Sequence, residues 1–427
     1  MYVFINRNIG EKIIVEDTNR EKVVLTVVLT FVEGIVGYML YKNNIFETES
    51  FWILFLSYVT PMGFLYFLNY WILSPLFIRI GLRIWSWSGH YRRVSKQFNK
   101  IAIQCVIWLK NVKTHWGVID TAEECQNANT CEGLLAMKKA KLDHRYKVIY
   151  EEALLSIINN VTDRGLASKS LKHETVVCTS MILYIFSMER KTNEKMLAFE
   201  EKFNNIASVL WEVRCNNGWG VYVGKTDEAD CSIANTFWAF RALNGYAISH
   251  SEDYRIMLRR IYENSSNSLF GYSAGDVPRL CTTAMSIVVY YSLEEQSRTI
   301  VKEVYDVKIA VEYVYRMFCY KGLECELEVL SGLETKSHSV KKVPWTHVTI
   351  AFVTEALVGA YKNGDLKLIK MNYFIGCLKK ICKKRLVYVN GNNQQCYYMP
   401  KDMEINSKGT YTFPTAYMAW ALSMFDF

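Results

Sequence analysis

The stretch that decides the fold runs from Trp219 to Leu243 and reads WGVYVGKTDEADCSIANTFWAFRAL. An aromatic-glycine turn is followed by a polar loop, and an Asn-Thr pair then opens an apolar segment. A second copy, WGVIDTAEECQNANTCEGLLAM, runs from Trp116 to Met137 in the same order. The repetition predicts that one structural unit is used more than once along the chain.

Four weaker copies keep the pattern of a turn followed by a threonine. They are Gly165 with Glu174-Thr175, Phe270-Gly271 with Thr282-Thr283, Gly332 with Val348-Thr349, and Tyr398 with Pro414-Thr415. Starting from Thr130, successive threonines are 45, 61, 47, 66 and 66 residues apart, which is long enough for two helices and their loops. Each threonine hydroxyl is expected to accept a hydrogen bond from an amide in the first turn of its helix.

Amphipathic segments lie between the threonine helices. The first has apolar residues at three-four spacing, which gives a helix one buried stripe. These residues are Phe98, Ile101, Cys105, Trp108 and Val112. Six inner and six outer helices can close into a ring, so residues 92–427 are predicted to form an all-α (α/α)6 toroid.

This pattern resembles the terpenoid cyclase and protein prenyltransferase family, whose α/α toroids carry squalene-cyclase-type repeats. The resemblance covers roughly residue 92 to the C-terminus and is best around Trp219-Gly220 and Trp116-Gly117. It implies isoprenoid chemistry, and a class II cyclase would place an Asp-x-Asp-Asp motif before an inner helix. The corresponding residues 232–236 contain no acid, and no Asp-Asp pair that could hold magnesium and diphosphate occurs in the chain.

Protein prenyltransferases hold zinc with Asp and Cys at the start of one inner helix and His at another. In that register the ligand positions here become Ser232, Ala234 and Pro414. A displaced set, Asp230, Cys231 and His347, has residue types that can bind zinc, and it stays open as an alternative metal site. The sequence therefore predicts no catalytic residue and no cofactor in the positions that the resemblance implies.

Aromatic residues of the inner helices are candidates for lining a pocket that suits an apolar chain or a lipid. They are Phe237, Trp238, Phe240, Tyr290, Tyr291, Tyr417 and Trp420. At helical spacing the same residues also suit an ordinary hydrophobic core, and the sequence leaves both interpretations open.

The N-terminal region is predicted to be a membrane anchor. Two mostly apolar segments, 23–41 and 51–78, are each long enough to cross a bilayer of about 30 Å. The expected organisation is a cytoplasmic segment at 1–22, a two-helix transmembrane hairpin at 23–78, an interfacial collar at 79–91, and the toroid at 92–427.

Charge placement predicts the topology of this anchor. Between Glu49 and Asp120 there are eight basic residues and no acidic one, while the whole chain has 50 basic and 42 acidic residues, a net charge of +8. The basic surplus is therefore local, and it does not favour a nucleic-acid partner. By the positive-inside tendency the toroid faces the cytoplasm from the cell (inner) membrane. Candidate contacts to lipid headgroups are Arg79, Arg83, Arg92, Arg93 and Lys96.

Glu33 lies near the middle of the first apolar segment, where a charge costs roughly 2.5–3.5 kcal/mol. Gly34 and Gly37 beside it would let another helix approach closely. These residues are candidates for an assembly contact in a homo-oligomer or for a polar pathway. A protonated Glu33 bonded to Thr30 is the alternative.

The twelve cysteines form no Cys-x-x-Cys pair, and most fall within apolar helical stretches. This pattern is typical of buried free thiols in a reducing compartment rather than of disulfides.

Together, these features favour a membrane-anchored cytoplasmic toroid that acts by binding, as a sensor or assembly module for an apolar ligand, a lipid or a protein partner. On architectural analogy alone, a bacterial membrane effector, for example in antiviral defence, fits this layout. The alternative is a membrane-bound enzyme, similar to terpenoid cyclases or prenyltransferases, that acts on a polyprenyl or lipid substrate. A secreted glycan-active α/α barrel would require the reversed topology and an explanation for the free cysteines.

Overall fold

The computed structural model describes residues 90–111, 126–167, 173–224, 228, 231–273, 275–324, 346–389, 395–399 and 412–425. Residues Tyr91–Phe427 form one compact unit. The predicted membrane hairpin at 23–78, the preceding segment and nearly all of the collar lie outside the described residues. Within the described part of the chain, no helix has the length and apolar character needed to cross a bilayer.

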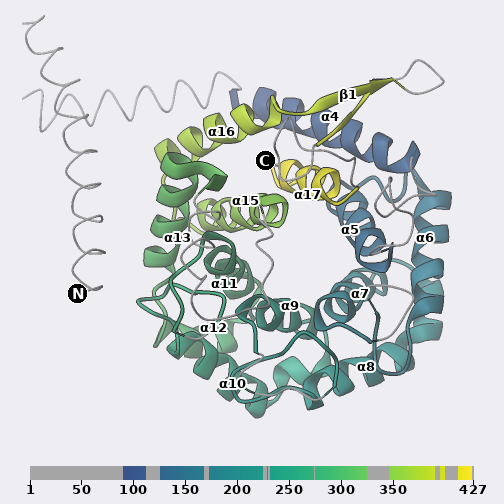
Figure 1. Cartoon of the computed structure of the whole chain (residues 1–427), viewed down its shortest axis with the longest axis vertical. Helices are drawn as coiled ribbons and strands as arrows, with labels where there is room; N and C mark the ends of the chain where they lie inside the picture. Colours follow the sequence, from purple (N-terminus) through teal and green to yellow (C-terminus); the bar gives the residue numbers. More distant parts are fainter. Residues whose placement is uncertain are drawn as a thin grey trace, which may run out of the picture. The chain divides into compact units, whose positions relative to one another are not determined.

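The compact unit is an α/α toroid in which the chain alternates between an outer and an inner layer of helices (Figure 1). The outer helices are α4 (His90–Asn111), α6 (Lys147–Asn160), α8 (Glu200–Glu212), α10 (Glu252–Glu263), α12 (Glu295–Lys302), α13 (Val307–Arg316) and α16 (Leu368–Cys382). The inner helices are α5 (Gln126–Lys139), α7 (Val176–Glu189), α9 (Ile233–Leu243), α11 (Leu280–Ser292), α15 (Thr346–Lys362) and α17 (Thr412–Ser423). The outer layer includes the short α12 in addition to the predicted outer helices.

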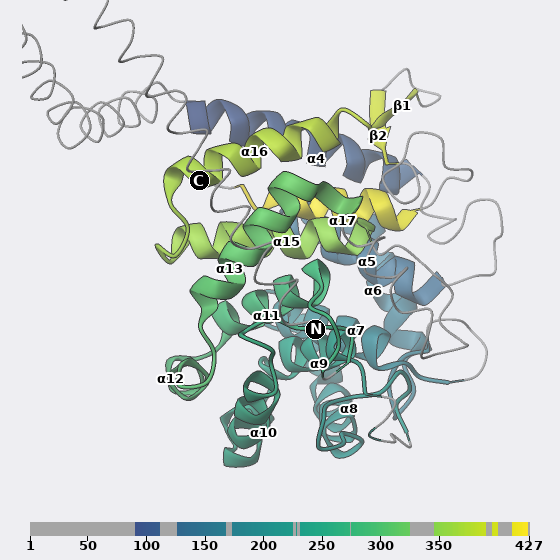
Figure 2. The same cartoon turned by 60° about the vertical axis from the view of Figure 1, so that its left-hand side comes forward.

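The inner helices form a closed ring, because each contacts the next in chain order and the last, α17, contacts the first, α5. The ends of the compact unit also meet, since the Phe98 and Phe425 rings lie 4.9 Å apart. In both views α16 lies beside α4, so the outer layer closes at the same place (Figures 1 and 2). The toroid predicted from the six threonine repeats is confirmed.

The two layers differ in how much of each helix is buried. Every residue of α9 from Ile233 to Leu243 is buried, because the helix has outer helices on one side and the opposite inner helices on the other. In contrast, α4 buries the predicted stripe from Phe98 to Trp108 and exposes Arg93, Lys96 and Lys100. The outer helices therefore separate the inner ring from solvent.

A repeated hydrogen bond explains the threonines in the inner helices. The Trp219 amide donates to Thr236 Oγ1 at 3.1 Å, and this hydroxyl donates to the Ser232 carbonyl at 2.8 Å. The turn before Trp219 must approach helix α9 closely for this bond to form. A Cβ on Gly218 would lie only 2.0 Å from Thr236 Oγ1. Glycine is therefore required at a position where φ is also +122°.

The same bond recurs in three other copies. The amides of Leu166, Phe270 and Met399 donate to Thr179, Thr283 and Thr415, at 2.9, 3.1 and 3.0 Å. The predicted role of the threonine as a first-turn cap is therefore wrong in these copies, because the hydroxyl binds the incoming extended segment. Thr175, which accepts from the Cys178 amide at 3.3 Å, is such a cap. The repeat threonine of that copy is Thr179.

Two further expectations are corrected. The fold is not entirely helical, because β1 (Leu386–Val389) and β2 (Gln395–Tyr398) form an antiparallel pair. The prediction of free thiols throughout is wrong for one pair, since Cys215 and Cys231 are joined in a disulfide. The other eight cysteines of the described residues are thiols outside any disulfide, and all of them except Cys377 are buried.

Candidate ligand site in the lumen of the ring

A pocket of about 470 Å³, with both polar and apolar lining residues, opens where the C-terminal ends of the inner helices converge. Its lining comes from α7, α9, α11 and α15 and from Met424, which follows α17. A volume of a few hundred Å³ is typical of small-molecule sites. Because four of the six inner helices contribute, together with Met424 just after α17, a molecule bound here would contact most of the ring.

The floor of this pocket is a network of three charged side chains and one tyrosine from four inner helices. Arg241 on α9 donates through Nη2 to both Glu355 oxygens on α15, at 2.8 and 2.9 Å, and to the Tyr184 hydroxyl on α7, at 3.1 Å. Lys139, the last residue of α5, donates to the same hydroxyl at 3.0 Å and to Glu355 at 3.3 Å. The bonds to Glu355 join helices that are not neighbours in the ring, α9 with α15 and α5 with α15.

The network keeps its members charged despite burial. Burial alone would raise the pKa of Glu355, but the neighbouring charges of Arg241 and Lys139 outweigh it and lower the pKa below its ordinary value. Burial would likewise lower the pKa of Arg241 and of Lys139, and the Glu355 carboxylate reverses both shifts. The floor therefore contains two cations and one anion at neutral pH.

Below the charged floor the lumen is filled by three aromatic rings. Trp238 on α9, Phe352 on α15 and Trp420 on α17 lie with ring centroids 5.3 to 6.3 Å apart. The Arg241 guanidinium carbon stands 5.0 Å from the Trp420 centroid and 5.7 Å from that of Trp238. The three rings therefore pack against one another and against Arg241 inside the ring of inner helices, although none of them lines the pocket itself.

Two donors in this region have no acceptor among the described residues, namely Arg241 Nη1 and Trp420 Nε1. Arg241 is 4% exposed and Trp420 is 1% exposed. Buried donors are almost always paired, because an unmet hydrogen bond is costly. Arg241 also lines the pocket, which places an unpaired guanidinium nitrogen on a residue that a ligand can reach.

The aromatic residues predicted to line a pocket separate into three groups. Trp238, Tyr417 and Trp420 lie inside the ring, and Tyr291 lines the lumen pocket, with its hydroxyl donating to Asp365 at 2.8 Å. Phe237 and Phe240 instead pack outward, against Tyr262 and Tyr254 of α10. Tyr290 lines a separate hollow of about 640 Å³ beside Tyr305.

A buried acid lies deeper in the lumen. Burial raises the pKa of Glu132 on α5 to about 8, although a hydrogen bond with the Tyr417 hydroxyl opposes the shift. Its Oε2 has no partner among the described residues, and neither does Asn129 Nδ2, one turn earlier on the same helix. Tyr417 also interacts with Cys281 on α11, which places this acid toward the interior of the ring. The carboxyl is therefore neutral over much of the physiological pH range.

The remaining sequence-predicted residues give no site among the described residues. The sulfur of Cys231 is in the disulfide, so it is not a thiolate ligand, while Asp230 and the side chain of His347 lie outside the described residues. Glu33, Gly34, Gly37, Arg79, Arg83 and the side chain of Arg92 also lie outside them. No cluster of metal-binding side chains occurs in the part of the chain that was described.

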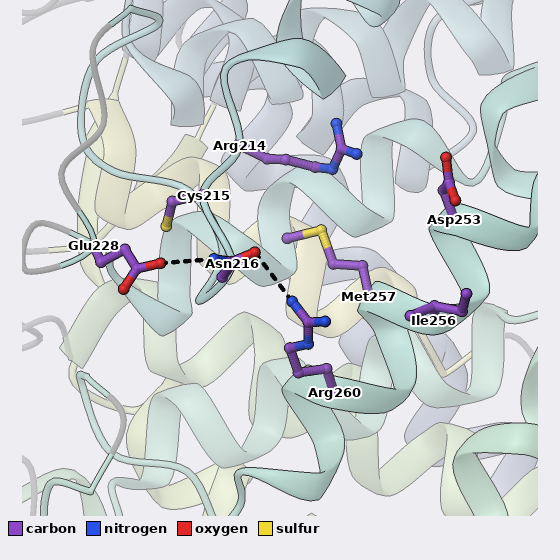
Figure 3. Close-up of a pocket in the computed structure, with 8 residues that line it drawn as sticks. All are labelled: Arg214, Cys215, Asn216, Glu228, Asp253, Ile256, Met257 and Arg260. Atoms are coloured by element: carbon purple, nitrogen blue, oxygen red, sulfur yellow. Dashed lines mark hydrogen bonds between the residues drawn. The ribbon is translucent and has the colours of Figure 1, made fainter.

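A second hollow, of about 600 Å³, lies between the end of α8 and α10 (Figure 3). Arg260 donates to Asn216 at 3.1 Å, and Asn216 donates to Glu228 at 2.9 Å. These three residues are exposed, and they form hydrogen bonds with one another. The lumen pocket, with its buried unpaired donor, is therefore the stronger candidate.

The charged residues of the lumen were missed by the sequence analysis, although they had a detectable signal. Arg241 and Glu355 each interrupt a run of apolar residues, Phe-Arg-Ala-Leu and Val-Thr-Glu-Ala-Leu. A lone charge inside a helix that is apolar on every side is expected to have a buried partner. The partner itself could not be read, because the pairing depends on which helices face each other across the ring.

No protein-family model matches this chain, and a comparison with curated proteins finds no match. Among solved structures, a glycoside hydrolase of family 105 from C. acetobutylicum ATCC 824 is similar, with a TM-score of 0.43 and 11% sequence identity. The similar region covers 77% of this chain and 98% of that one. The class of the protein, an α/α toroid, rests on the closed ring of helices itself.

Proposed function

We propose that this chain is a membrane-anchored sensor whose ligand binds in the lumen pocket of a cytoplasmic toroid. The observation that carries the proposal is the pocket itself, since one cavity contacts four inner helices and is lined by a buried guanidinium with a nitrogen that has no acceptor among the described residues. A ligand there can change the packing of the whole ring, whereas a surface site would affect one or two helices.

The output in this proposal is the N-terminal region. Its two apolar segments have the length of membrane spans, and Glu33 with Gly34 and Gly37 offers a contact between copies of the chain. Basic residues near the membrane, including the exposed Arg93 and Lys96 on α4, would favour anionic lipid headgroups and the cytoplasmic orientation. A role as a bacterial antiviral effector is one setting for such a sensor.

A second candidate function is an enzyme similar to terpenoid cyclases or prenyltransferases, acting on a polyprenyl or lipid substrate. One observation favours it, namely the buried Glu132 carboxyl with its raised pKa and unpaired Oε2. A neutral acid inside an apolar cavity can donate a proton to a bound substrate. Against it, the Trp238 and Trp420 rings pack against each other inside the ring, with centroids 6.3 Å apart.

Three variants separate these functions in one cell-based assay that complements a deletion of the gene. Ser292→Trp places a large ring at the exposed mouth of the pocket, Glu33→Ala alters the first apolar segment, and Glu132→Gln removes the acid. A sensor loses its response with Ser292→Trp, changes it with Glu33→Ala, and keeps it with Glu132→Gln. Loss of function with Glu132→Gln alone, at normal abundance in the membrane fraction, would contradict the sensor and support the enzyme.

A further inference from the structure

Two buried hydrogen-bond donors in the lumen have no acceptor among the described residues. Arg241 Nη2 donates hydrogen bonds to both oxygens of Glu355 and to the Tyr184 hydroxyl, while Nη1 has no acceptor among the described residues. Trp420 does not itself line the pocket, but its Nε1 is a second donor without an acceptor among the described residues, and the Arg241 guanidinium carbon lies 5.0 Å from the centroid of that ring. Both residues are more than nine-tenths buried, so bulk water does not satisfy them.

The charged residues that line the pocket are mostly positive. Three cations, Lys191, Arg241 and Lys362, and one anion, Glu355, line the pocket. The anion is already engaged by Arg241 Nη2 and by Lys139. A bound cation would face this positive surplus, and a neutral apolar molecule would leave the buried donors unpaired.

We propose that the pocket binds a small molecule through an oxyanion group, a phosphate or a carboxylate, whose oxygens accept hydrogen bonds from Arg241 Nη1 and Trp420 Nε1. This inference rests on the proposed function, because it names the ligand class of the same pocket. Guanidinium and indole N–H groups both donate to such oxygens, and the bonds strengthen when water is excluded. The remainder of the ligand occupies the volume between Tyr291 and the mouth.

Glu355 has a positioning role in this site. By holding Nη2 with both oxygens at 2.8 and 2.9 Å, it fixes the plane of the guanidinium group and leaves Nη1 for the ligand. Its negative charge also opposes the ligand's charge, so the neutral variant Glu355→Gln is expected to bind the oxyanion more tightly rather than less.

Calorimetric titration of the full chain in detergent tests the inference with inorganic phosphate, acetate and tetramethylammonium as probes. We expect phosphate or acetate to bind and tetramethylammonium not to bind, and the better of the two anions identifies the oxyanion. Arg241→Lys and Trp420→Phe should each raise the Kd for that anion about tenfold or more, because each removes a hydrogen bond to a charged group. Trp211→Phe, the same change away from the pocket, should leave it unaltered.

Trp420→Phe keeps an aromatic ring in place, so it decides the question even where Arg241→Lys fails to fold. Equal anion binding by the wild type, Trp420→Phe and a folded Arg241→Lys would overturn the inference, as would wild-type protein that binds neither anion. The proposed function fails separately. If Ser292→Trp displaces a copurified molecule while no oxyanion binds, the pocket remains the ligand site and only the ligand class is wrong.

Discussion

Arg241 and Glu355 are joined by two hydrogen bonds of 2.8 and 2.9 Å, although their helices, α9 and α15, are separated in the ring by α11. The pair therefore spans the lumen rather than linking neighbours. It forms the floor of the pocket and fixes the orientation of the Arg241 guanidinium, which lines the pocket. Structure and proposed function depend on the same bond.

Loss of one partner in this pair should destabilise the toroid strongly. Glu355→Leu leaves the guanidinium of Arg241 buried without its counter-charge, and we expect the free energy of unfolding to fall by about 3–5 kcal/mol. Glu303→Leu is the control, because Glu303 pairs with Arg259 at 3.2 Å with both side chains about half exposed, and should cost less than about 1 kcal/mol. Similar losses in chemical denaturation would show that the lumen pair is not buried as described.

The turn glycine of the repeat makes a second prediction. Gly218→Ala introduces a Cβ within 2.0 Å of Thr236 Oγ1 at a φ of +122°, so it should destabilise the protein by about 1–3 kcal/mol. Gly376→Ala, on the exposed side of α16 with open space around its Cβ, should instead stabilise it by about 0.5–1 kcal/mol. Thermal unfolding of both variants gives the comparison, and the same sign of effect in both would refute the repeat geometry.

Glu132 makes stability depend on pH. Its pKa rises from 4.5 in the unfolded chain to about 8 in the fold, so between these values the folded state keeps a proton that the unfolded state loses. Stability should therefore fall with rising pH across this window, by up to about 1.4 kcal/mol per pH unit from this group. The contribution is complete below pH 4.5 and lost above about pH 8. Glu132→Gln should flatten the profile in denaturation at pH 5 to 8, and an unchanged slope would mean that Glu132 is ionised in the fold.

The membrane topology is a prediction from the basic residues near the apolar segments. A reporter fused after Phe427 should be active only in the cytoplasm, and the fusion should sediment with the membrane fraction. An active periplasmic reporter would overturn the cytoplasmic placement, and a fusion found in the soluble fraction would exclude the anchor.

The toroid could be predicted because its signal is repeated. One Trp-Gly turn is common, but six threonines at comparable spacing indicated six inner helices, and all six threonines lie in or directly before those helices. In the copy that begins at Gly165 the repeat position was assigned to Thr175 instead of Thr179, because these two threonines, four residues apart, both fit the sequence pattern. Only the path of the chain shows that Thr179 meets the incoming Leu166 amide.

Other features of the structure were not predicted from the sequence, each for a different reason. The strand pair around Leu386–Val389 and Gln395–Tyr398 had a recognisable signal, a Val-Tyr-Val run before Asn-Gly, but it was hidden by the helical repeat. The lumen network has no local signal for its pairing, because Lys139, Arg241 and Glu355 are far apart in sequence. Contacts across the centre of a ring depend on how the whole ring closes.

The most direct test of the central claim, that the lumen pocket holds a ligand, is native mass spectrometry of the full chain purified in detergent from the cells that make it. The wild type and Ser208→Trp, a matched substitution on the exposed side of the outer helix α8, should carry a bound small molecule. Ser292→Trp, at the pocket mouth, should lack it. A wild type without any bound molecule, or equal occupancy in all three proteins, would contradict the account.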